Sequence, residues 1–129
     1  MKFSAIIAVA SAALVSAQAQ WSGDAACGRV EGANAASHTI ATEGIPYLRN
    51  LGGTNCHAPP RFCQRVSCSG GSGIFLCNDN NNDVNIRCET IGEGAARIFN
   101  ACNGNSTPYF KGQQFAAGGW NVVVRASDC

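Results

Sequence analysis

Few side chains in this sequence could carry acid–base chemistry. His38 and His57 lie in the first half of the chain with Glu43 between them, and arginines are scattered along its length. A ribonuclease or other hydrolase needs a base, an acid and often a cationic group in one cleft. These residue types are present, but no spacing ties them together, and no serine lies in a G-x-S-x-G motif. The sequence therefore favours a non-catalytic protein, with a small secreted hydrolase or ribonuclease as the alternative.

The only pattern that suggests a metal is a run of asparagine and aspartate. Asp79, Asn81 and Asp83 have the i, i+2, i+4 spacing that opens an EF-hand calcium loop. Val84 stands where that loop requires glycine, and Thr90 stands where it requires a bidentate glutamate. We therefore predict a polar turn here. Because the sequence also has no C-x-x-C pair and its two histidines are isolated, we expect no zinc site and no cofactor.

Two further segments carry local chemistry. Asn105 begins an Asn-Ser-Thr acceptor for N-glycosylation, although Pro108 follows the motif closely. The segment 69–73 is rich in glycine and serine, but it lacks the lysine and the following helix of a phosphate-binding loop, so we expect a flexible lead into a strand. Four aromatic residues could be exposed anchors for a protein or carbohydrate partner: Trp21, Tyr47, Tyr109 and Phe110.

The cysteines give the strongest signal. An even number in an exported chain predicts a disulfide framework. The eight cysteines are Cys27, Cys56, Cys63, Cys68, Cys77, Cys88, Cys102 and Cys129. Eight cysteines allow about 105 pairings; our hypothesis is Cys27–Cys102 and Cys56–Cys129, with the remaining four pairing among themselves.

The first 19 residues have the features of a signal peptide. A basic start at Lys2 precedes an apolar run from Ala5 to Val15, and Ala17-Gln18-Ala19 fits the small-x-small cleavage rule. The run is too short to span a bilayer, so no transmembrane anchor is expected. We therefore predict a signal peptide at 1–19 and a single secreted domain at 20–129, located outside the producing cell.

The charge balance of the predicted mature chain excludes some partners. Without Lys2, eight basic and eight acidic residues remain. Proteins that coat polyanions or lyse membranes need a strong positive field, so no nucleic-acid partner is expected. A monomer that binds an extracellular protein, receptor, channel or glycan fits this balance better.

The second half of the chain has clear secondary-structure patterns. The runs 73–77 and 84–88 resemble strands, and the Asn/Asp residues between them predict a hairpin. A helix is expected from the capping-box sequence at Thr90 to Cys102, with Asn103-Gly104 as its stop. A closing strand is expected at 120–126, turned back by Gly118-Gly119 onto the segment around Phe115.

The first half is less regular. Residues 45–51 could form a short helix, with Pro46 in its first turn and Gly52 past its end. The cysteine- and proline-rich stretch 56–68 is expected to be an irregular, disulfide-pinned connection. Together these patterns predict an α+β fold, a small disulfide-rich sandwich with an antiparallel sheet of three to five strands and one or two packed helices.

The chain also resembles known groups of secreted proteins. The stretches Val66-Ser67-Cys68-Ser69 and 73–80 (GIFLCNDN) are similar to a signature of small cysteine-rich secreted ascomycete proteins that are counted as candidate effectors. The order of elements over the second half resembles the smut-fungus viral killer-toxin family, from the glycine-rich lead after Cys68 to a glycine-rich closing strand and the terminal Cys129. This resemblance implies an α/β sandwich and action on a host or competitor target outside the producing cell. The functional lysine of that family has no counterpart here, so no active residue is carried over.

The expected function is therefore that of a secreted effector or killer-toxin-like binding protein. A small hydrolase or ribonuclease, and a carbohydrate-binding protein of the cell wall, are the alternatives.

The signal peptide gives a direct prediction. Mass spectrometry of the protein collected outside the producing cell should find the N-terminus at Gln20 or within a few residues of it, because cleavage is expected after Ala19. Recovery of Met1 in the extracellular protein would contradict export by this route.

Overall fold

The computed structural model describes residues 20–129, and the predicted signal peptide lies outside the described residues. The elements, in chain order, are β1 (Ala26–Cys27), β2 (Ala35–Ala36), α2 (Ser37–Thr39), the π-helical turn η1 (Ile40–Gly44), α3 (Ile45–Arg49), β3 (Asn55–Ala58), β4 (Phe62–Ser69), β5 (Ser72–Asn78), β6 (Val84–Arg87), α4 (Cys88–Ala101), β7 (Tyr109–Phe110), β8 (Gly112–Ala116) and β9 (Trp120–Ala126).

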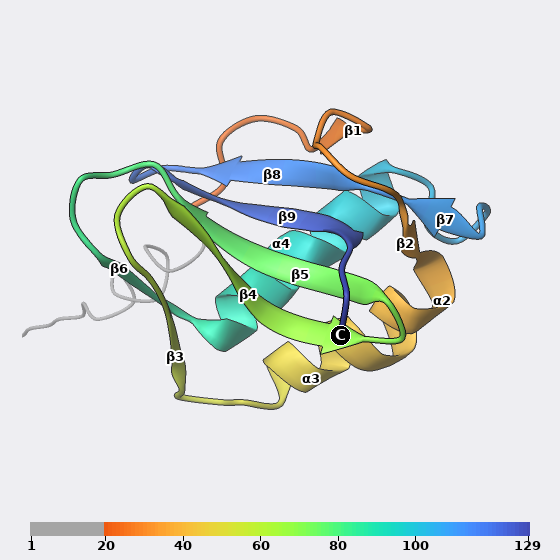
Figure 1. The fold of residues 1–129 in the computed structure, drawn as a ribbon, viewed down its shortest axis with the longest axis horizontal. Coiled ribbons are helices and arrows are strands. Elements are labelled where there is room, and N and C mark those ends of the chain that lie inside the picture. The colour runs from red at the N-terminus through yellow and green to blue at the C-terminus, as the bar shows by residue number, and fades with distance from the viewer. Residues whose placement is uncertain (1–19) are drawn as a thin grey trace, which may run out of the picture.

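A five-stranded antiparallel sheet forms the centre of the fold. Its strand order is β1-β8-β9-β5-β4, and two short ribbons, β2-β7 and β3-β6, lie beside it. The long helix α4 crosses behind the sheet in Figure 1, and α3 packs beside it. The predicted α+β, disulfide-rich fold is therefore confirmed.

Strand β5 is an interior strand of this sheet. All seven of its residues are buried, and it pairs with β4 along one edge and with β9 along the other. Successive side chains of a strand point to opposite faces. Ile74 and Leu76 accordingly enter the main core with the helices, whereas Phe75 and Cys77 form a small second cluster with Val123 on the opposite face. We call the face that carries this second cluster the outer face.

Helix α4 has the predicted apolar stripe, with Ile91, Ala95 and Ile98 buried against the sheet. The predicted capping box at Thr90 is wrong. The helix already begins at Cys88, and no side chain caps it. Instead the Cys88 amide donates to the carbonyl of Thr54, the residue just before β3, at 2.9 Å. This carbonyl takes the place of a capping side chain as the acceptor for an amide at the start of the helix. The stop is as expected: Asn103 has a φ of 60°, and the Gly104 amide donates to the Phe99 carbonyl.

The helical segment in the first half starts earlier than residues 45–51. It runs from Ser37 through the π-helical turn to Arg49. Pro46 lacks the amide hydrogen that would continue a regular α-helix, which favours a wider turn just before it. Gly44 in that turn lets β5 approach closely, because a Cβ there would lie 2.9 Å from Ile74 Cδ1 and would require this methyl group to move.

The predicted hairpin between 73–77 and 84–88 is wrong, as is the irregular connection at 56–68. β6 pairs with β3, and the hairpin partner of β5 is β4, joined through Gly70-Gly71. Both glycines have positive φ, so the glycine-rich segment is a tight turn and not a flexible lead. The strand β5 could not accept β6 because both of its edges are already occupied.

The asparagine run that follows β5 is an internal hydrogen-bonding centre. Asn78 is buried, and its Nδ2 lies 3.2 Å from the Ala58 carbonyl, 3.0 Å from that of Pro59 and 2.8 Å from that of Asn82. Its Oδ1 accepts from the Asn80 amide at 2.8 Å. One side chain therefore joins the β3–β4 connection to the turn after β5.

All eight cysteines are paired. The bridges are Cys27–Cys102, Cys56–Cys88, Cys63–Cys77 and Cys68–Cys129. The predicted Cys27–Cys102 pair is confirmed. The predicted Cys56–Cys129 pair is wrong. Of the four cysteines that were expected to pair among themselves, Cys63 and Cys77 do so, whereas Cys68 pairs with Cys129 and Cys88 pairs with Cys56. Cys56 lies on β3, which pairs with β6 directly before Cys88, whereas the C-terminus returns alongside β4.

Replacement of Asn78 tests the internal centre. Asn78→Ala should lower the free energy of unfolding by about 2–4 kcal/mol, because buried carbonyls lose their donor. Urea unfolding measures this change. Asn82→Ala is the matched control: it keeps the backbone carbonyl that Asn78 binds, so its effect should stay within about 0.5 kcal/mol. Equal effects of the two replacements would show that the Asn78 side chain has no special structural role.

Candidate ligand-binding groove

The structure does not gather the candidate acid–base residues into one site. His57 on β3 lies 3.0 Å from the Asp83 carboxylate, and both side chains are about half exposed. His38 is exposed on α2, and Glu43 accepts a hydrogen bond from Ser69. Among the described residues, no pocket is lined by both histidines.

The three residues with calcium-loop spacing also have separate surroundings. Asp83 contacts His57, and Asn81 Oδ1 accepts from Arg61 Nε at 3.1 Å. Asp79 lies on the opposite side of the turn, at the rim of the groove described below. Within residues 20–129, no group of three or more His, Cys, Asp or Glu side chains is placed to hold a metal ion.

The other predicted site residues are at or near the surface, with one exception. Asn105 is exposed in the turn after α4, where a glycan could be attached. Tyr47 and Tyr109 are more than half exposed. Trp21 is half-buried and packs edge-on against Trp120, with ring centroids 5.6 Å apart. Phe110 is buried in the core and cannot be an anchor.

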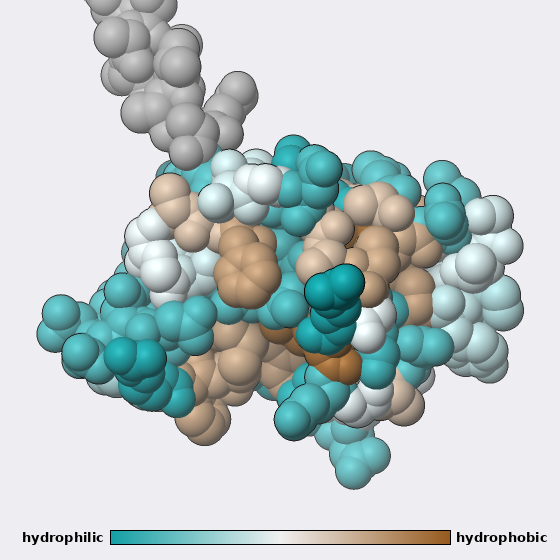
Figure 2. All heavy atoms as spheres, turned by 90° about the horizontal axis from the view of Figure 1, so that it is seen from above, coloured by the Kyte–Doolittle hydropathy of each residue, from teal (hydrophilic) through white to brown (hydrophobic). Residues whose placement is uncertain are grey.

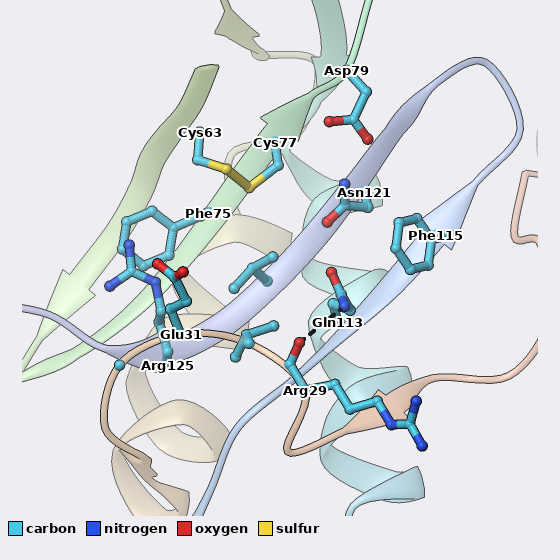
Figure 3. A pocket seen from close by; sticks show the side chains of 13 residues that line it. Arg29, Glu31, Cys63, Phe75, Cys77, Asp79, Gln113, Phe115, Asn121 and Arg125 are labelled. Atoms are coloured by element: carbon cyan, nitrogen blue, oxygen red, sulfur yellow. Dashed lines mark hydrogen bonds between the residues drawn. A yellow bond between two sulfur atoms is a disulfide. The ribbon is translucent and has the colours of Figure 1, made fainter. Parts of the chain in front are cut away.

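The largest of four surface pockets compared lies on the outer face of the sheet, opposite α4. It has a volume of about 600 Å³, within the usual range for ligand sites. Figure 3 shows its side chains standing on β5, β9 and β8, with the loop 28–34 along one side. Its main lining residues are Arg29, Glu31, Phe75, Asp79, Gln113, Phe115, Asn121 and Arg125, together with the Cys63–Cys77 disulfide. We call this site the outer-face groove.

The strand registers give the groove a regular order. Across β8, β9, β5 and β4, one row of directly paired residues is Phe115, Asn121, Cys77 and Cys63. An amide side chain therefore lies between a phenyl ring and a disulfide, as Figure 3 shows. On the same face, Phe75 pairs with Val123 and Arg125 pairs with Gly73 in the row beyond. The Arg125 guanidinium lies 4.2 Å from the centre of the Phe75 ring, a cation–π contact that holds both side chains in place.

Asn121 is the least expected residue in this row. It is 4% exposed, and its side-chain Oδ1 is buried without a hydrogen-bond partner in the described chain. Buried polar atoms almost always have a partner, because leaving one unpaired costs about 1–3 kcal/mol. Asparagine at the centre of an otherwise apolar row therefore lowers stability, and the side chain that carries this unpartnered oxygen lines the groove.

The charges of the groove are balanced. It is lined by two arginines, Arg29 and Arg125, and by two carboxylates, Glu31 and Asp79, and in the described chain none of the four forms an ion pair with another charged side chain. Figure 3 places Glu31 and Asp79 at opposite ends of the groove. Unpaired charges at a rim, around an aromatic and amide centre, are typical of a surface that selects a polar ligand.

Comparisons with known proteins add no identification. The chain matches no protein-family model, and neither the curated proteins nor the solved structures that were compared show a significant match. No helix in residues 20–129 is long and apolar enough to cross a membrane.

The groove was not predicted from the sequence, although a signal for it was present. In the expected strand at 120–126, alternation places Trp120, Val122 and Val124 on one face. The same alternation puts Asn121, Val123 and Arg125 on the other face, and a polar residue amid valines there marks a surface that the core does not use.

Removal of the orphaned polar group should stabilise the protein. Asn121→Leu keeps a similar shape, so we expect the free energy of unfolding to rise by about 1–3 kcal/mol. Thermal and urea unfolding measure the change. The same replacement at the exposed Asn85 on β6 is the control, with an expected change within about 0.5 kcal/mol. A loss of stability in Asn121→Leu would mean that the amide has a structural role within the fold.

Proposed function

We propose that this protein is a secreted, non-catalytic binding protein of the effector or killer-toxin type. It acts as a monomer outside the producing cell, in a setting such as the host apoplast, and engages a host or competitor molecule through the outer-face groove. The observation that carries the proposal is the buried, unpartnered Asn121 oxygen in the centre of that groove. The four disulfides are compatible with an oxidising, extracellular location.

The lining of the groove supports binding over catalysis. It contains no serine, threonine, histidine, lysine or tyrosine, and its two cysteines are joined to each other. Covalent catalysis would need an activated nucleophile of one of these kinds or a carboxylate. The two carboxylates present are at opposite ends, whereas a glycosidase holds its pair about 5–10 Å apart across the scissile bond.

A hydrolase or ribonuclease remains the second candidate because of one contact. The His57 imidazole lies 3.0 Å from the Asp83 carboxylate, an arrangement that orients a histidine as a base. However, the pair lies on the β3–β6 ribbon, and neither residue lines any of the four pockets described. An exposed pair outside a cleft has no means of holding a substrate in place.

Two variants separate these functions. The double replacement His38→Ala with His57→Ala should keep nearly full activity in leaf infiltration or in growth inhibition of competitor cells. Asn121→Leu should require at least about tenfold more protein for the same response, because a hydrogen bond buried in an interface is lost. Circular dichroism and thermal unfolding establish that both variants are folded. A folded histidine variant without activity would support the hydrolase, and full activity in Asn121→Leu would overturn the groove as the binding surface.

A further inference from the structure

The geometry points to an uncharged oligosaccharide as the ligand of the outer-face groove, and we propose that the protein binds such a glycan there. This inference rests on the proposed function, because it assigns a ligand class to the same groove. Three independent properties of the groove support it. They are the mixed polarity of its central row of side chains, the lack of a free strand edge in its floor, and its equal numbers of positive and negative side chains.

The central row requires a ligand that is polar and apolar at once. The Asn121 amide needs a hydrogen-bonding group from outside, yet Phe115 flanks it on one side and the Cys63–Cys77 disulfide on the other. A sugar ring meets both demands, since its hydroxyl groups donate and accept around the edge while its C–H groups cover an aromatic face. Phe115 is 42% exposed, so part of its ring is open for such a contact. The row crosses three strand spacings, about 14 Å, which suits a ligand of several linked rings.

The backbone of the groove excludes the common way of binding a peptide. An extended peptide usually adds to a free strand edge, where main-chain hydrogen bonds supply affinity. Here the floor is formed by β9 and β5, which are paired on both edges. The floor of the groove therefore offers a ligand side chains but no free strand edge. The amides of Asn121 and Gln113 are suited to hydroxyl groups, and Gln113 Nε2 is positioned by the Arg29 carbonyl at 3.3 Å.

The charge of the groove favours a neutral ligand. Two arginines and two carboxylates line it, so a polyanion would meet Glu31 and Asp79, and a polycation would meet Arg29 and Arg125. The single lysine of residues 20–129, Lys111, does not line the groove; its Nζ donates to the Gly32 carbonyl. A neutral glycan is repelled by neither pair of charges, and its hydroxyl groups can form charge-assisted hydrogen bonds with those charged side chains that they reach.

The side of the molecule seen from above in Figure 2 has a surface of mixed polarity, on which apolar side chains appear between hydrophilic groups.

NMR titration of the ¹⁵N-labelled protein tests the proposal. The probes are hexasaccharides of β-1,4-glucose, β-1,4-N-acetylglucosamine, β-1,3-glucose and β-1,4-xylose, with an oligogalacturonate as the charged comparison. At least one neutral hexasaccharide should shift amide signals of β5, β8 and β9 around the groove, and the oligogalacturonate should bind more weakly. Asn121→Leu and Phe115→Ala should each weaken binding at least about tenfold. Phe62→Ala is the matched control, because Phe62 is similarly exposed but does not line the groove, and it should bind as the wild type does.

The outcomes also separate this inference from the proposed function. If no neutral hexasaccharide shifts the groove signals at millimolar concentration, the glycan class is wrong. The binding function then still stands if Asn121→Leu has lost biological activity. If an uncharged peptide of similar length shifts these signals and no glycan does, a polypeptide is the ligand and the inference is overturned. Equal weakening by Phe62→Ala and Phe115→Ala would place the glycan outside the groove, with the same consequence.

Discussion

The whole structure depends on the pairing of the interior strand β5. Each of its seven residues is buried, and both of its edges are paired, so its register with β4 and β9 decides which side chains enter the core. A slip by one residue would exchange Ile74 and Leu76 for Phe75 and Cys77 on the helix side. The Cys63–Cys77 bridge joins directly paired residues of β4 and β5, and it therefore fixes this register covalently. The register of β5 therefore decides both which side chains line the outer-face groove and which side chains pack in the core against the helices.

The other three disulfides hold the periphery to this centre. Cys27–Cys102 attaches the edge strand β1 to the end of α4, Cys56–Cys88 attaches the β3–β6 ribbon to its start, and Cys68–Cys129 attaches the C-terminus to β4. Two of them span 75 and 61 residues, and long loops gain most from a cross-link in the chain-entropy description. Such stabilisation allows a small domain to tolerate a polar residue such as Asn121 at a buried position.

Local patterns in the sequence predicted the elements that local interactions decide. The apolar stripe of α4, the Asn103-Gly104 stop and the turn at Gly118-Gly119 all follow from periodicity and backbone preference, and all are present. Pairing between distant strands was not predictable in this way. The Asn run does make a turn after β5, but β9, more than forty residues later in the sequence, occupies the edge that β6 was expected to take. Alternation places Asn121 in a strand, whereas only the packed structure shows that its oxygen lacks a partner.

The central claim is that the Asn121 amide is kept for a ligand and is not used by the fold. Hydrogen exchange of its ¹⁵N-labelled side-chain NH₂ group tests this claim most directly. The account predicts that a glycan bound in the groove shifts the signals of this group and clearly slows its exchange with water. Signals and exchange that no ligand of the groove changes would show that the amide is engaged within the fold and would contradict the account.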